Sequence, residues 1–327
     1  MTIVLLILLI IVLLVLALGY AAFFFACVRM PVQPDPAKSK SLRAFAEDIS
    51  AGAQWFREQD PERVQITSDD GLRLVGWFLP APDAKGTLLL VHGYRSSPFI
   101  DFGLTYRFYH SLGWNILTVC QRAHCESDGQ YITYGVKERF DVRDWTLYLA
   151  DRFGPAHHIA LIGISMGSAT VLMSLGTDLP QNVRCVVADC GYTSPYDQFV
   201  HMFKERFHFP MHPTLDIANL FAKLFAGFGF KDYSTVTALQ TNQLPVLFVH
   251  GEKDHFVPIR FTVDNYAACL AEKRLITVPE AGHGTSYIFA TETCQNAVRD
   301  FLSTYGGFFF PYENPPSGHN PDGGFRF

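Results

Sequence analysis

The residues best suited to chemistry are Gly163-Ile164-Ser165-Met166-Gly167, a serine with a glycine two residues away on each side. An apolar run, residues 159–162, precedes the motif, and a run of small residues, 168–173, follows it. A sharp turn from a strand into a helix exposes such a serine as a nucleophile, and the glycines avoid collisions with neighbouring backbone. This context favours a nucleophilic serine over a glycine-rich turn with a bystander serine.

Two further residues complete a possible catalytic set. His283 lies between two glycines after an apolar run, and Asp254 follows the apolar run before it. A neutral histidine accepts the proton of an attacking serine, and an ionised carboxylate orients that histidine. We predict Ser165 as the nucleophile, His283 as the base and Asp254 as the acid.

Other residues compete for these roles. Asp189 also follows a strand, and Glu252 lies close to Asp254, so both are alternatives for the acid. Three other histidines lie near strand ends. We expect His92 to have a supporting structural role, His250 to lie in the core and His255 to lie in a loop.

Short apolar runs alternate with helix-length segments along most of the chain. An Asp-Gly turn at residues 69–71 separates two of the runs and predicts an antiparallel hairpin of residues 64–67 and 72–79. Continuous apolar strands that alternate with helices indicate a parallel sheet covered on both faces, with ligands at the carboxyl ends of the strands. The further predicted strands are residues 87–91, 115–119, 158–162, 183–188, 245–249 and 275–278.

The chain order Ser165, Asp254, His283, together with the serine turn, resembles the α/β-hydrolases over residues 60–305. The sequence looks most like membrane-anchored bacterial α/β-hydrolase-domain proteins grouped with serine aminopeptidases and monoacylglycerol lipases. This resemblance implies an α/β fold, with a mostly parallel central sheet, helices on both faces and a small helical cap. It also implies an oxyanion hole formed by the backbone N–H groups of Tyr94 and Met166, with His92, Gly93, Gly163 and Gly167 as supporting motif residues.

A second stretch, residues 121–129, is similar to the R-x-H-G-x-S-x-G loop of the same family. Cys125 replaces the usual glycine, which leaves the local shape of the backbone open. A redox or catalytic role for Cys125 is the alternative, although no neighbouring base supports it.

Residues 3–28 carry no charged side chain, and about 20 apolar residues suffice to cross a bilayer. We expect a transmembrane anchor at residues 1–29. The apolar run is longer than that of a typical signal peptide and no basic segment precedes it, so cleavage is the less favoured alternative. A lipoprotein cysteine at Cys27 is disfavoured by the bulky Phe24 and Phe25. Basic residues after the span predict a cytoplasmic catalytic domain.

The remaining chain divides into a linker with an amphipathic helix around Ser41–Phe56 (residues 30–60), a hydrolase domain (61–306) and a flexible tail (307–327). Residues 191–243 form the expected cap, in which we expect two or three aromatic side chains to face a pocket and the others to fill the core. The phenylalanines of the cap are Phe199, Phe203, Phe207, Phe209, Phe221, Phe225, Phe228 and Phe230.

The composition of the chain gives no sign of a nucleic-acid partner and bears on the state of its cysteines. The 327 residues are 49% hydrophobic with a formal net charge of −5, and no basic run suggests a nucleic-acid partner. Seven cysteines favour reduced thiols over the possible disulfides Cys120–Cys125 and Cys185–Cys190. We predict no cofactor and no metal.

The resulting prediction is a membrane-anchored serine hydrolase that acts on an ester, thioester or amide with a hydrophobic acyl group. A hydrophobic or lipid-like acyl compound would be its substrate. The alternatives are a peptidase of the aminopeptidase or prolyl oligopeptidase type and a catalytically silent binding protein on the same fold.

Overall fold

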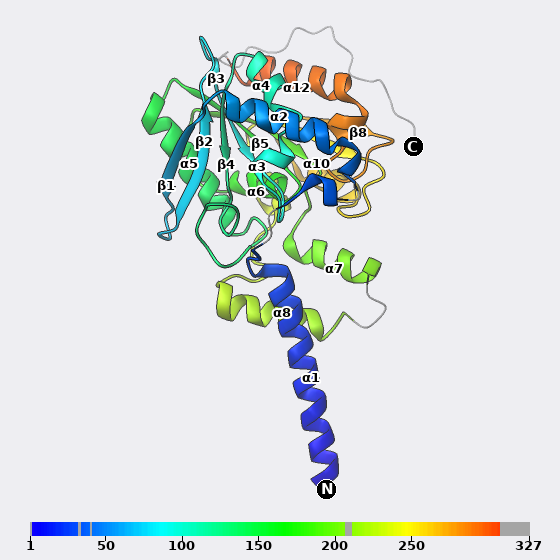
Figure 1. The fold of residues 1–327 in the computed structure, drawn as a ribbon. Coiled ribbons are helices and arrows are strands. Elements are labelled where there is room, and N and C mark those ends of the chain that lie inside the picture. Colours follow the sequence, from blue (N-terminus) through cyan, green and yellow to red (C-terminus); the bar gives the residue numbers. More distant parts are fainter. Residues whose placement is uncertain (1, 32–33, 40, 207–210, 308–327) are drawn as a thin grey trace.

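A twisted sheet of eight strands forms the centre of the molecule (Figure 1). The structure is a computed structural model, which describes all residues except 1, 32–33, 40, 207–210 and 308–327. The strand order is β1-β2-β4-β3-β5-β6-β7-β8; β2 pairs antiparallel with β1 and β4, and the other pairs are parallel. The strands are β1 (Glu62–Thr67), β2 (Arg73–Leu79), β3 (Gly86–Val91), β4 (Asn115–Val119), β5 (His158–Ile164), β6 (Val183–Asp189), β7 (Val246–Gly251) and β8 (Lys273–Val278).

The burial of the strands follows from their position in the sheet. Every residue of β3, β4 and β7 is buried, because helices cover both faces of these interior strands. Strand β1 lies at an edge and is mostly exposed. The predicted hairpin and all six further strands are confirmed.

Two apolar layers flank the sheet. One contains Phe56, Tyr106 and Phe301 from α2, α4 and α12, and the other contains Trp145 and Leu172 from α5 and α6. The helices are α1 (Thr2–Cys27), α2 (Ala46–Glu58), α3 (Pro98–Asp101), α4 (Tyr106–Ser111), α5 (Glu138–Phe153), α6 (Met166–Ser174), α7 (Pro195–Arg206), α8 (Thr214–Phe221), α9 (Thr235–Leu239), α10 (Arg260–Ala268), α11 (Ser286–Phe289) and α12 (Thr291–Tyr305).

The linker helix begins later than the sequence suggests. The predicted helix around Ser41–Phe56 is an α-helix only from Ala46, preceded by a 3₁₀ turn at Arg43–Phe45. Glu47 and Asp48 occupy the first turn of α2, where negative charge stabilises the amino end of a helix.

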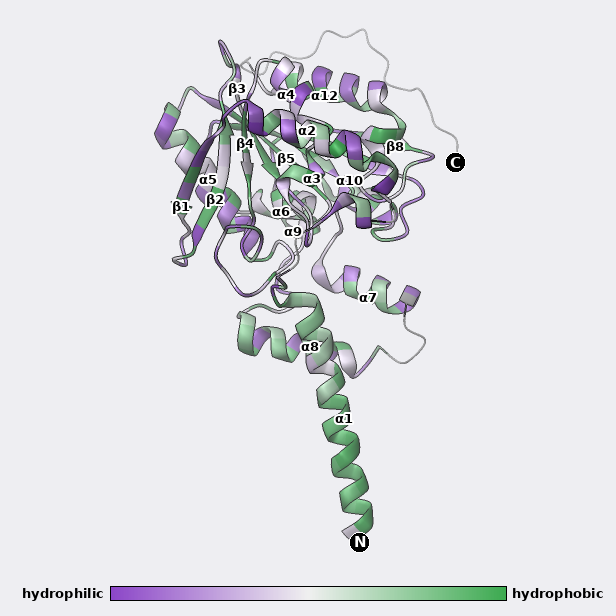
Figure 2. Cartoon of the chain, in the orientation of Figure 1, coloured by the Kyte–Doolittle hydropathy of each residue, from purple (hydrophilic) through white to green (hydrophobic). Residues whose placement is uncertain are grey.

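Helices α7 and α8, a π-helical turn (Ala222–Ala226) and α9 occupy the segment between β6 and β7 in which the cap is expected. Helix α8 packs across α1, which extends away from the sheet and is apolar along its length (Figure 2). A third apolar cluster includes Phe23, Leu215 and Phe230 and joins α1 to this segment. Phe207, Phe209 and the predicted tail after Gly307 lie outside the described residues.

All seven cysteines lie within the described residues, and none is paired with another. Cys125 is exposed and the other six are buried. Neither of the two disulfides considered from the sequence is formed in the structure.

Candidate active site

Ser165 lies at the junction between β5 and α6. Its backbone has φ 56° and ψ −119°, a strained conformation for a residue with a side chain. The Ser165 N–H donates to the carbonyl of Asp189 at 2.9 Å, which ties the turn to the neighbouring strand β6. The serine is thus held at the carboxyl edge of the sheet, as the motif predicts.

The two glycines of the motif are required by close backbone contacts. A Cβ atom at Gly163 would lie 2.3 Å from the carbonyl oxygen of Gly167. A Cβ atom at Gly167 would lie 1.9 Å from the carbonyl oxygen of Val91, in β3. Any side chain at either position would therefore force the strand, the turn and the helix apart.

The structure brings Ser165, His283 and Asp254 together. His283 Nε2 lies 2.8 Å from Ser165 Oγ, and His283 Nδ1 lies 2.7 Å from Asp254 Oδ2. This arrangement is the one that general-base catalysis uses, in which the imidazole donates its Nδ1 proton to the carboxylate and accepts the serine proton at Nε2.

Four groups hold the carboxylate of Asp254. Its Oδ1 accepts the backbone N–H groups of Phe256 at 2.9 Å and Val257 at 2.8 Å. Its Oδ2 faces His283 and also lies 3.3 Å from Nε2 of the buried His250. Burial alone would raise the pKa of Asp254, but hydrogen bonds from the two histidines outweigh burial and hold that pKa far below its usual range. Asp254 is therefore ionised at neutral pH.

His250 is the partner of Asp254 that the sequence did not reveal. It was expected to be a core histidine, and it is buried, with hydrogen bonds to Thr262 Oγ1 at 2.7 Å and to the Val257 carbonyl at 2.8 Å. Its contact with the acid adds a positioning role to that core position.

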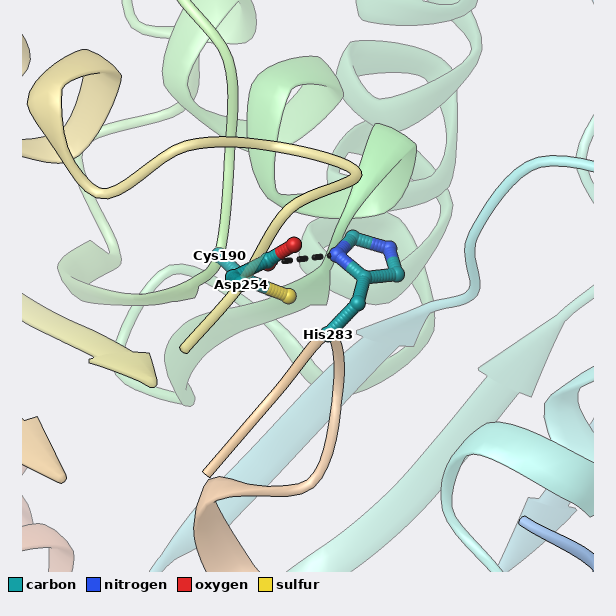
Figure 3. A group of neighbouring side chains, drawn as sticks. All are labelled: Cys190, Asp254 and His283. Carbon is teal, nitrogen blue, oxygen red and sulfur yellow. Dashed lines mark hydrogen bonds and ion pairs between the residues drawn. The ribbon is translucent and has the colours of Figure 1, made fainter. Parts of the chain in front are cut away.

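Cys190 lies beside Asp254 and His283, so that all three side chains offer possible metal ligands (Figure 3). Burial raises the pKa of the Cys190 thiol well above its usual value, whereas a metal requires the thiolate. Asp254 and His283 also bond to one another along the dashed line of Figure 3. The donor set therefore fits the Ser-His-Asp hydrogen-bond chain better than a metal centre.

The predicted oxyanion donors flank Ser165. Met166 is the first residue of α6, so its N–H has no acceptor within the helix. The N–H of Tyr94 has no acceptor among the described residues. A Cβ atom at Gly93 would lie 3.2 Å from Ser165 Cβ, so the Gly93–Tyr94 segment passes directly over the serine.

Asp101, in α3, is a support of this segment that sequence reasoning missed. Its carboxylate accepts the Gly93 N–H at 2.6 Å and the Ser96 hydroxyl at 2.5 Å. Burial raises the pKa of Asp101, and these hydrogen bonds oppose the rise. No motif in the sequence marks Asp101.

His92 and His124 are two buried histidines that support the same loops. Nε2 of His92 accepts the Gln121 N–H at 3.2 Å, and Nε2 of His124 accepts the Arg95 N–H at 3.0 Å. Burial lowers the pKa of both rings, that of His124 to about 4, and keeps them neutral as acceptors. The supporting position expected for His92 agrees with these contacts.

Cys125 adopts φ 44°, a left-handed conformation that suits the glycine usually found there. The loop therefore keeps, at Cys125, the backbone conformation expected for the glycine of the family. The Cys125 side chain lies on the surface, and its Sγ lies 4.0 Å from the Ser96 carbonyl oxygen.

The side chains or loops of the competing candidates contact groups other than Ser165 Oγ and the His283 ring. Glu252 is exposed and accepts from Thr277 Oγ1, and His255 is in contact with His201 through its backbone carbonyl. Asp189 is buried, receives a long hydrogen bond of 3.5 Å from Ser286 and has a pKa raised by burial to about 6.

A cavity of about 460 Å³ opens onto Ser165. Its wall is mainly apolar and comes from α1, α7, α8 and the loops around the serine. Among the aromatic side chains expected in the cap, Phe199, Phe203 and Phe230 line it, in agreement with the expected two or three.

Two families of known proteins match parts of this chain. Residues 86–209 match the family described as alpha/beta hydrolase fold, and residues 230–306 match the family described as TAP-like protein. The chain is 27% identical to the uncharacterized protein YqkD of Bacillus subtilis, over 76% of this chain and 81% of that protein. It is 23% identical to the protein bem46 of Schizosaccharomyces pombe, over 78% of this chain and 83% of that protein.

Solved structures share the fold. An esterase of Pyrococcus furiosus superposes with a TM-score of 0.63 at 24% identity, over 77% of this chain and 96% of that one. An acylaminoacyl peptidase of Pyrococcus horikoshii superposes with a TM-score of 0.57 at 16% identity, over 77% of this chain and 43% of that one. With the sheet order and the serine turn, these matches show that the chain belongs to the α/β-hydrolase superfamily.

Proposed function

We propose that the protein is a serine hydrolase that cleaves a carboxylic ester, thioester or amide with a hydrophobic acyl group. The observation that carries this proposal is the continuous hydrogen-bond chain from Ser165 through His283 to Asp254 at the mouth of an apolar cavity. The esterase and the peptidase among the similar structures support hydrolysis as the reaction class.

In the proposed reaction, His283 Nε2 accepts the Ser165 proton while the serine oxygen attacks the acyl carbon. The N–H groups of Tyr94 and Met166 receive the negative charge that develops on the carbonyl oxygen. His283 then donates the proton to the leaving group and leaves an acyl-enzyme. A water molecule activated by the same histidine releases the acid and restores the serine.

We also propose that α1 anchors the protein in a membrane. Among the described residues, α1 is the one helix that is long and apolar enough to cross a bilayer, and most of its residues before Gly19 are exposed. Exposed leucine and isoleucine side chains of this density are stable in hydrocarbon but not in water. The proposed orientation, with the catalytic domain in the cytoplasm, comes from the basic residues after the helix.

The cavity favours an acyl substrate over a peptide. The residues that line it, as far as the structure describes them, include no aspartate or glutamate that could bind a peptide amino terminus. The peptidase alternative is therefore the weaker interpretation of this cavity. The intact hydrogen-bond chain of Ser165, His283 and Asp254 argues against a catalytically silent binding protein.

The proposed function is tested by hydrolysis of p-nitrophenyl esters with acyl chains from two to sixteen carbons. We expect turnover by the detergent-solubilised full chain and a loss of about 10³-fold or more in the Ser165→Ala and His283→Ala variants. Equal slow hydrolysis by all three folded proteins would contradict the proposal and favour a binding protein.

A further inference from the structure

The last three turns of α1 form part of the wall of the serine cavity. Leu18, Ala21, Ala22 and Phe25 line the same cavity as Ser165. The opposite walls come from α7 and α8. The apolar amino-terminal helix therefore belongs to the proposed substrate site as well as to the proposed anchor.

The carboxyl end of α1 is fixed to the loop that carries a predicted oxyanion donor. Arg95 Nη2 donates to the Phe25 carbonyl at 2.7 Å, and the hydroxyls of Tyr94 and Tyr134 donate to the Ala26 carbonyl at 2.8 and 2.9 Å. Carbonyls at the end of a helix have no partner within it, and a cation there is favourable. These bonds set the position of the α1 wall relative to Ser165.

Helix α8 crosses α1 at the depth of the cavity. The absence of a side chain at Gly19 allows Ile217 to approach, since a Cβ atom there would lie 2.2 Å from Ile217 Cγ2. On α8 and the following π-helical turn, Leu220, Leu224 and Phe225 are 50%, 66% and 53% exposed. This apolar surface continues that of α1.

The length of α1 places the cavity at the membrane surface. Its 26 residues span about 39 Å at 1.5 Å per residue, whereas the hydrocarbon core of a bilayer is about 30 Å thick. If Thr2 lies at the far boundary, the near boundary falls near Ala21, which is one of the cavity residues. The exposed side chains of α8 and the π-helical turn would then contact the bilayer.

We propose that α1 is a specificity-determining part of the acyl site, and that the substrate is a bilayer-resident amphiphile whose acyl chain lies against α1. This inference rests on the proposed function, because it takes the cavity at Ser165 as the acyl site. The acyl chain passes from the hydrocarbon into the cavity along Leu18 and Ala21, and its ester group reaches Ser165 at the surface.

The test compares two alanines of α1. Ala21 lines the cavity, whereas Ala17 is exposed and is not among the lining residues. Ala21→Phe fills part of the cavity, and Ala17→Phe adds the same ring to the outer surface of the helix. Both full-length variants and the wild type are placed in phosphatidylcholine nanodiscs, and kcat/KM is measured for p-nitrophenyl esters of two to sixteen carbons.

We expect Ala21→Phe to lower kcat/KM for chains of twelve or more carbons at least about tenfold relative to the two-carbon ester. Ala17→Phe should keep the wild-type profile. An unchanged chain-length profile in Ala21→Phe would overturn the inference. Labelling of Ser165 by a small fluorophosphonate shows that each variant is folded, and Leu18→Trp replaces Ala21→Phe if that variant does not label. If the wild type neither labels nor turns over, the proposed function itself has failed.

Discussion

Replacing Asp254 by asparagine should keep the fold and remove most of the activity. Oδ1 of Asp254 accepts two backbone N–H groups, from Phe256 and Val257. An asparagine must place its oxygen at the same position, because its amide nitrogen cannot accept these hydrogen bonds. The NH₂ group then faces His283 Nδ1, which becomes an acceptor and moves the imidazole proton to Nε2.

With its proton on Nε2, His283 cannot accept the proton of Ser165. The corresponding loss in other triads is about 10⁴-fold in kcat, equivalent to about 5.5 kcal/mol of transition-state stabilisation. The rates of ester hydrolysis and of fluorophosphonate labelling should both fall by about this factor. Glu252→Gln is the matched control, because this carboxylate lies on the same loop, is exposed and bonds to Thr277.

Circular dichroism and thermal unfolding establish that the Asp254→Asn protein is folded. The reasoning is refuted if the folded variant keeps its activity within tenfold of wild type, because the orientation of the imidazole would then not depend on Asp254.

Three further substitutions test the supports of the site. Gly167→Ala should destabilise the fold by about 3 kcal/mol or more, because its Cβ would meet the Val91 carbonyl at 1.9 Å. Arg122 lies in the loop of residues 121–129 and forms a buried ion pair at 2.6 Å with Asp141 of α5. Arg122→Met should cost about 3–5 kcal/mol, because it leaves that buried carboxylate without its cation. The folded-state pKa of His124, about 4, lies below its ordinary value of 6.5, so its neutral form stabilises the fold above pH 6.5. This contribution, about 3 kcal/mol, should be lost as the pH falls from 6.5 towards 4, and the loss should be absent in His124→Gln.

Urea unfolding measures the free energy of unfolding of each variant, and for His124→Gln it is repeated over a range of pH. A matched substitution serves as the control for Gly167→Ala and for Arg122→Met. Gly307→Ala meets nothing within 4 Å, and Arg63→Met breaks an exposed ion pair with Glu126 that is worth less than about 1 kcal/mol. Equal stability of a test variant and its control would contradict the proposed support. An equal pH slope in wild type and His124→Gln would show that His124 does not titrate in this range.

The parts of the fold that the sequence predicted depend on local patterns. The strands were visible as apolar runs, and the position of Ser165 followed from glycines that local backbone contacts require. The apolar runs before Ser165, Asp254 and His283 also placed these residues after the carboxyl ends of β5, β7 and β8. Each of these features is set by residues close in sequence or by the order of the strands.

The features that escaped prediction depend on the path that individual loops take and on the packing between helices, not on a repeating pattern. Asp101 reaches the Gly93 N–H from a short helix without a motif, and His250 reaches Asp254 only because the loop after β7 folds back on it. The apolar composition of α1 predicts an anchor. The packing of its carboxyl-terminal part against α8, beside the serine cavity, depends on the close approach of Ile217 to Gly19. Such contacts leave no periodic signal in a single sequence.

The central claim is that Ser165 is an activated nucleophile. The most direct measurement is the labelling of the purified full chain by a fluorophosphonate, with the modified residue identified by mass spectrometry. We predict one adduct on Ser165 in the wild type, no adduct in Ser165→Ala and strongly slowed labelling in His283→Ala. Folded wild-type protein that stays unlabelled, or that carries its adduct on another residue, would contradict the claim.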